Sequence, residues 1–172
     1  MYQVSERVKK QFEYTMSIPC VKEAMKFIQE DERNTIEEQK ELVLIEAPTG
    51  EEEKRAAVMM EKFKALGLEN VHIDRGGNVV GLRRGSGKGP KVLIEGHLDT
   101  VFPFGTVHGV EERDGFLYAP GIGDDTRSTG NAVGTFKSIE SERDQDIRRH
   151  CICGNYPRGR YGRPRRNERF PE

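Results

Sequence analysis

Residues 91–101 read K-V-L-I-E-G-H-L-D-T-V, and this stretch decides the fold class. It opens with a short apolar run between Pro90 and Gly96, which is typical of a strand buried inside a sheet. Open α/β sheets place their functional sites directly after such strands. We therefore expect an α/β fold with a site at His97 and Asp99.

The spacing of His97 and Asp99 favours a metal ligand with a supporting carboxylate. In an extended segment, side chains two residues apart point to the same side. A metal-binding histidine commonly gives its second ring nitrogen to a carboxylate, which fixes the tautomer and raises the basicity of the ring. His97 would then be the ligand and Asp99 the residue that orients it. The alternative is a structural pair, because most buried polar groups are hydrogen-bonded.

A second motif, A-P-G-I-G-D-D-T-R, occupies residues 119–127. It places the carboxylates of Asp124 and Asp125 next to each other after a glycine-rich turn, which is costly without a cation. A carboxylate that bridges two divalent ions would relieve that cost. A solvated turn is the alternative.

Together the two motifs resemble the co-catalytic zinc metallopeptidase and deacylase family. That family includes acetylornithine deacetylase, succinyl-diaminopimelate desuccinylase, aminoacylase, glutamate carboxypeptidase and peptidase T. The D-D-T-R ending looks most like the peptidase T-like branch. The resemblance covers residues 35–127. It implies the N-terminal part of an α/β three-layer sandwich catalytic domain, of the phosphorylase/hydrolase-like type, that hydrolyses amide bonds in small peptides or N-acyl amino acids.

The resemblance also implies roles for three residues. His97 matches a ligand of one zinc ion, Asp124 matches the carboxylate that bridges both ions, and Asp99 matches the catalytic residue that holds the histidine. Cobalt or manganese could replace zinc. In this family a glutamate takes the proton from water, two ions polarise the scissile carbonyl, and intact members can form a homodimer.

Helices are predicted before these motifs. Helical spacing of apolar residues over 21–28 predicts a helix within an N-terminal helical extension that spans residues 1–32. Capping-box patterns that begin at Thr35 and Thr49 predict the starts of two further helices.

Residues 33–127 would form a partial catalytic domain, including two strands that follow the helices. The periodicity then fades, so residues 128–172 are predicted to be an aberrant, disordered, arginine-rich tail. The Glu-Glu pair, the strand before it and the late histidine ligand of the family pattern are not recognisable there. We therefore expect a chain that is incomplete and has negligible turnover.

A shift of reading frame offers one cause for this tail. Read in the +1 frame, codons for residues 149–167 permit an apolar strand followed by Glu-Glu-Gly, which is the pattern that the family requires at this distance. Otherwise the chain is a truncated family member with an ordinary disordered tail, and a poorly folded remnant with no catalysis is a blander alternative. The nucleotide sequence beyond codon 128 would decide.

Composition excludes several other classes of protein. There are 28 Lys+Arg against 29 Asp+Glu, which argues against a dedicated nucleic-acid or membrane binder. No run approaches the 18 or so apolar residues of a membrane span, and no secretory signal is visible. Three cysteines, two of them in C-I-C, favour a reducing cytoplasm. The alternative function is a non-catalytic protein whose arginine/glycine-rich tail, residues 154–172, binds single-stranded nucleic acid.

Overall fold

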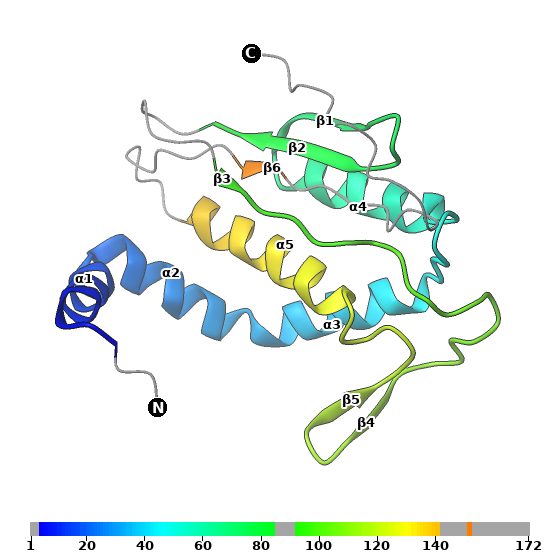
Figure 1. Ribbon diagram of the computed structural model, residues 1–172, viewed down its shortest axis with the longest axis horizontal. Coiled ribbons are helices and arrows are strands. Elements are labelled where there is room, and N and C mark those ends of the chain that lie inside the picture. The colour runs from blue at the N-terminus through cyan, green and yellow to red at the C-terminus, as the bar shows by residue number, and fades with distance from the viewer. Residues whose placement is uncertain (1–3, 85–91, 142–150, 153–172) are drawn as a thin grey trace.

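Helices lead the chain and short strands follow them (Figure 1). The computed structural model describes residues 4–84, 92–141 and 151–152. Within these residues the elements are α1 (Glu6–Ser17), α2 (Pro19–Glu30), α3 (Glu32–Leu44), α4 (Glu53–Ala65), β1 (Glu69–Ile73), β2 (Val79–Arg83), β3 (Val92–Leu93), β4 (Glu111–Arg113), β5 (Phe116–Tyr118), α5 (Thr126–Ser141) and β6 (Cys151–Ile152).

The main sheet has the strand order β1-β2-β6-β3. β1 and β2 are the two predicted strands and pair antiparallel, while β6 runs antiparallel to β2 and parallel to β3. A separate hairpin of β4 and β5 projects from the body of the molecule (Figure 1). Its turn has positive φ at Asp114 (54°) and Gly115 (77°), the backbone that a two-residue Asp-Gly hairpin turn requires.

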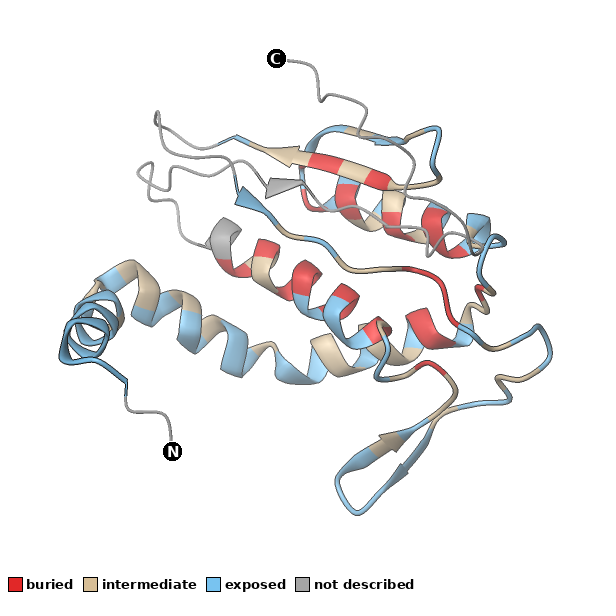
Figure 2. Ribbon diagram, viewed as in Figure 1, coloured by how far each residue is buried: buried red, intermediate tan, exposed pale blue. Residues whose placement is uncertain are grey.

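The apolar core lies where α3, α4 and α5 meet each other and the sheet (Figure 2). Phe63 of α4 and Phe136 of α5 touch edge to face, with ring centroids 6.4 Å apart. Gly81 in β2 leaves room for this packing, since a Cβ there would lie 2.9 Å from Cδ1 of Leu68. The core therefore joins the helices to strand β2 and to Leu98 beside the site.

Helix α5 continues the fold past Arg127, where the predicted catalytic part ends. Ala132, Val133 and Phe136 are buried in the core. Gly134 faces α3, and a Cβ at that position would lie 3.2 Å from Oγ1 of Thr35. Because glycine takes a position on the buried face, the apolar stripe of this helix is hidden in the sequence. The described fold therefore runs past the boundary predicted at residue 127, through α5 and the short strand β6, and the start of the predicted tail lies in a helix.

The two predicted capping boxes do not form. α3 begins at Glu32, ahead of Thr35, and α4 begins at Glu53 with no side-chain capping bond at Glu52. The hydroxyl of Thr49 instead bonds to a residue fifty positions away. The Thr49 hydroxyl is therefore used by a long-range partner and is not available to cap the helix.

Strand β3 is shorter and more exposed than the predicted buried strand. Only Val92 and Leu93 belong to it, with exposed fractions of 37% and 52%. It is an edge strand of the described sheet, with β6 as its neighbour on one side. In contrast, β6 adds a strand between β2 and β3 that the sequence patterns do not predict.

Several predictions concern residues outside the described ranges. These are the arginine-rich segment 154–172 with its alternative nucleic-acid function, the disorder predicted for it, and most of the stretch to which the frame-shift hypothesis applies. None of the helices in the described ranges has the length and apolarity needed to cross a membrane.

Candidate metal site

His97 and Asp99 lie on an irregular segment that follows β3. Backbone bonds fix this segment to the loop between α3 and α4: Thr100 donates its N–H to the Ala47 carbonyl (2.8 Å), and Thr49 donates to the Thr100 carbonyl (3.2 Å). Leu98 points into the core and is 4% exposed. Because side chains alternate along an extended segment, His97 and Asp99 lie on the other side.

Asp99 holds one nitrogen of the His97 ring. Nδ1 of His97 lies 3.1 Å from Oδ1 of Asp99 and 2.9 Å from its backbone carbonyl oxygen. The Asp99 side chain is 1% exposed, so water cannot substitute for these contacts. The predicted pairing of the two residues is present in the structure.

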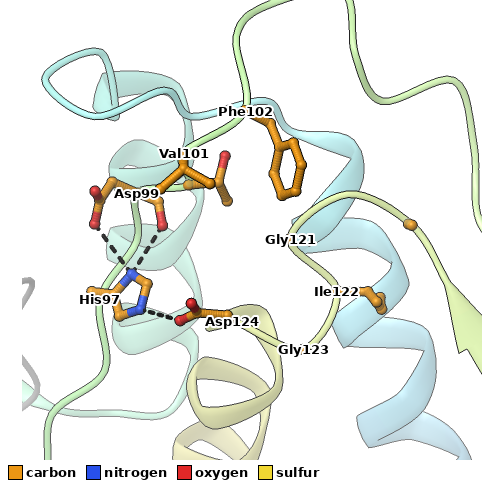
Figure 3. A pocket seen from close by; sticks show the side chains of 10 residues that line it. His97, Asp99, Val101, Phe102, Gly121, Ile122, Gly123 and Asp124 are labelled. Carbon is orange, nitrogen blue, oxygen red and sulfur yellow. Dashed lines mark hydrogen bonds and ion pairs between the residues drawn. The ribbon is translucent and has the colours of Figure 1, made fainter.

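Asp124 lies at the other nitrogen of the same ring. The glycine-rich turn packs tightly here, since a Cβ at Gly121 would lie 2.7 Å from Cγ2 of Thr100. Gln39 of α3 donates to the carbonyl of Ile122 (2.6 Å), which fixes the turn on the helix. The turn brings Oδ1 of Asp124 to 2.8 Å from Nε2 of His97 (Figure 3). Two motifs 27 residues apart thus meet at one imidazole.

The two flanking carboxylates control the protonation of this ring. Burial acts to lower the pKa of His97, but the hydrogen bond to Asp124, the Asp99 carbonyl and the charges of Asp99 and Asp125 raise the pKa above its ordinary value. Only an imidazolium can donate from both nitrogens at once. Without a metal, the ring is therefore held in its protonated form more firmly than an ordinary histidine.

The donors at this site suit zinc in kind. Zinc binds imidazole nitrogen and carboxylate oxygen at about 2.0–2.2 Å, so two ligands of one tetrahedral ion lie roughly 3.3 Å apart. The Nε2 to Oδ1 distance of 2.8 Å is close to that value, and the Asp124 side chain is 74% exposed, so it can move by the difference. In number they fall short, because no group of three or more His, Cys, Asp or Glu able to hold a metal exists among the described residues. The described residues therefore supply two zinc ligands, His97 and Asp124.

A cavity of about 260 Å³ opens beside these groups. His97, Asp99 and Asp124 line its polar side, while Val101, Phe102 and Ile122 supply apolar wall (Figure 3). The other two histidines of the described part, His72 and His108, are exposed and do not line this cavity. The cavity can therefore hold a small molecule with both polar and apolar parts next to the imidazole.

Arg55 is a residue of the site that sequence reasoning missed. It is 2% exposed, donates from Nη1 to the Leu98 carbonyl (2.6 Å) and from Nε and Nη2 to the Ile45 carbonyl (2.9 and 2.6 Å). Burial lowers the pKa of Arg55 to about 10, and the charge of Asp99 acts in the opposite direction. Its signal in the sequence is an arginine one turn before Met59 on the apolar face of α4.

Comparisons with known proteins find hydrolases with similar sequences. The chain is 47% identical over 62 residues to a candidate LysW-lysine/LysW-ornithine hydrolase of Pyrococcus abyssi, covering 36% of this chain and 18% of that protein. A relative from Thermococcus kodakarensis with the same description is 35% identical over 82 residues, covering 48% of this chain and 22% of its own length. The chain thus spans about a fifth of the length of these curated relatives. No family model matches.

Solved structures agree on the fold. A tripeptidase from Staphylococcus aureus superposes with a TM-score of 0.60 at 26% identity, covering 71% of this chain and 36% of that one. Human carnosine dipeptidase 1 gives 0.63 at 20% identity, covering 79% and 34%. This chain is thus similar to hydrolases in sequence and to peptidases in fold. The fold matches part of the catalytic domain of these peptidases, in agreement with the predicted α/β fold class.

Proposed function

We propose that this chain provides part of a metal-dependent hydrolase site for amide bonds in small peptides or N-acyl amino acids. The observation that supports it is the convergence of His97 Nε2 and Asp124 Oδ1 at 2.8 Å on a cavity, with Asp99 on the far nitrogen of the ring. The hydrolases and peptidases among its relatives support the same reaction class.

His97 and Asp124 would hold a divalent ion, and zinc suits their donor types best. Cobalt and manganese accept the same donors. Such an ion supplies Lewis acidity toward a carbonyl and a lowered pKa of water. The role of Asp99 is to keep a proton on Nδ1, so that the lone pair of Nε2 faces the cavity.

The cavity walls would contribute binding rather than chemistry. Val101 and Phe102 present apolar surface close to His97, where it can contact the acyl side of a small substrate. No glutamate lines the cavity among the described residues, so the general base that the family resemblance implies is not supplied by them. We accordingly expect negligible turnover by the 172-residue chain.

We also propose that the chain works in a reducing cytoplasm, because its three cysteines do not show the spacing of a disulfide-bonded protein.

Metal titration tests the proposal directly. Zinc, or cobalt as a visible probe, is titrated into the purified chain by calorimetry and absorption. Removal of one ligand in His97→Ala or Asp124→Ala should weaken binding at least about tenfold. His72→Ala removes an exposed histidine and is the matched control, which should bind as the parent does. Equal affinity in all four proteins would refute the assignment of the ligands.

A hydrolysis assay tests the expected incompleteness. The chain is incubated with zinc and with dipeptides or N-acetyl amino acids, and released amine is measured. We expect no release above the His97→Ala background. Sustained turnover that depends on His97 would show that the described residues are joined by others into a complete site.

A further inference from the structure

Thr49 lies beside the site although the sequence places it fifty residues before Asp99. The loop of residues 47–49 runs along the segment that ends at Thr100, with Pro48 and Thr100 in a parallel bridge. Thr49 donates its backbone N–H to the Thr100 carbonyl at 3.2 Å. This pairing brings the Thr49 side chain against Asp99 independently of what its hydroxyl does.

The hydroxyl of Thr49 is committed to Asp99. Its Oγ1 lies 2.6 Å from Oδ2 of Asp99 and 3.5 Å from the Thr100 carbonyl oxygen. A threonine hydroxyl has one proton to donate, so the shorter contact takes it. The oxygen that this bond leaves, Oδ1, lies 3.1 Å from Nδ1 of His97, which also lies 2.9 Å from the Asp99 carbonyl oxygen, so the two oxygens share the Nδ1 proton.

An aspartate carboxylate turns easily about its terminal torsion, where the rotamer wells are broad. In the interior, where Asp99 is 1% exposed, its orientation must be fixed by protein donors. Thr49 supplies such a donor on one oxygen and His97 supplies one on the other. The two bonds together define a single plane for the carboxylate.

We propose that Thr49 is a positioning residue of the metal site. Its hydroxyl fixes the Asp99 carboxylate so that Oδ1, together with the Asp99 carbonyl, holds the proton on His97 Nδ1 and Nε2 faces the cavity. This inference rests on the proposed role of His97 as a ligand. A capping role for Thr49 does not explain the hydroxyl, because α4 has no side-chain capping bond at its start.

Nitrogen-15 NMR of the histidine rings in the metal-free, full-length chain tests the proposal. The Nδ1 proton of His97, assigned by its loss in His97→Ala, should be protected from solvent exchange in the parent. Thr49→Val keeps the shape and the backbone bond but lacks the hydroxyl, and it should exchange this proton roughly tenfold faster, as the loss of one buried hydrogen bond predicts. Thr49→Ser retains the hydroxyl and should restore the protection.

Two further measurements separate positioning from folding. Thr49→Ala makes the same deletion without branching at Cβ, and exchange of the Thr100 amide reports whether the loop pairing persists in each variant. Unchanged exchange of the His97 proton in both hydroxyl-deleted variants, or failure of Thr49→Ser to restore it, would overturn the proposal. Because no metal is added, the exchange rates test the role of Thr49 even if the chain binds no zinc. Failure to bind zinc would refute the proposed function only.

Discussion

At the scale of single residues, the position of His97 between two carboxylates decides which protons its ring carries. The raised pKa of His97 means that protonation of this residue stabilises the folded, metal-free chain at low pH. That stability is fully present below the unfolded pKa of about 6.5 and is lost as the pH rises through the higher folded value. The exposure of Asp124 at 74% allows solvent to screen part of this effect.

Zinc affinity should therefore rise with pH. An incoming ion must replace the proton at Nε2, so the apparent affinity should increase roughly tenfold per pH unit below the pKa of His97 and level off above it. Calorimetry in two buffers of different ionisation enthalpy would measure the proton released per zinc bound. Binding without proton release at low pH would contradict a role for this imidazole.

At the scale of elements, α5 links the site to the core. It begins two residues after Asp124, and its middle buries Phe136 in the core that α3 and α4 share. Thr126, its first residue, donates its hydroxyl to the carbonyl of Ile122 at 2.9 Å, which ties the glycine-rich turn to the helix. The position of Asp124 therefore depends on the docking of this helix.

Truncating the side chain that docks α5 should destabilise the whole fold. Phe136 is 0% exposed, so Phe136→Ala should lower the free energy of unfolding by about 3–5 kcal/mol. Asn131→Ala on the exposed face of the same helix should change it by less than about 0.5 kcal/mol. Urea unfolding followed by circular dichroism measures both, and similar midpoints for the two variants would place α5 outside the cooperative unit.

Local patterns predicted some parts of the molecule and not others. The β1–β2 pair and the meeting of His97 with Asp99 depend on neighbours in sequence, and both were predictable. The start of α4 was not, because the hydroxyl of Thr49 has its partner fifty residues away. Helix α5 was hidden because Gly134 packs closely on α3 where a periodic pattern would place an apolar side chain.

At the scale of the whole molecule, the open edge of the described sheet matters for behaviour in solution. β3 exposes Val92 and Leu93 and pairs on one side only within the described residues. Unpaired strand edges with apolar side chains are templates for pairing with another chain. We therefore expect this edge, as far as the described residues form it, to favour self-association.

A charge on that edge should keep the chain monomeric. Leu93→Lys should lower concentration-dependent light scattering, because lysine on an edge strand opposes pairing between chains. Asn131→Lys adds the same charge on α5, away from the edge, and should leave the scattering as it is in the parent. If both variants scatter equally, association proceeds through another surface.

The buried guanidinium of Arg55 has one more consequence. From within the hydrophobic core, it donates hydrogen bonds to the carbonyl of Leu98, which lies between His97 and Asp99, and to the carbonyl of Ile45 at the end of α3. The packing of the core around Arg55 therefore affects the orientation of the His97 ring. Repacking the face of α4 around this arginine would retune metal affinity from a distance, with no ligand altered.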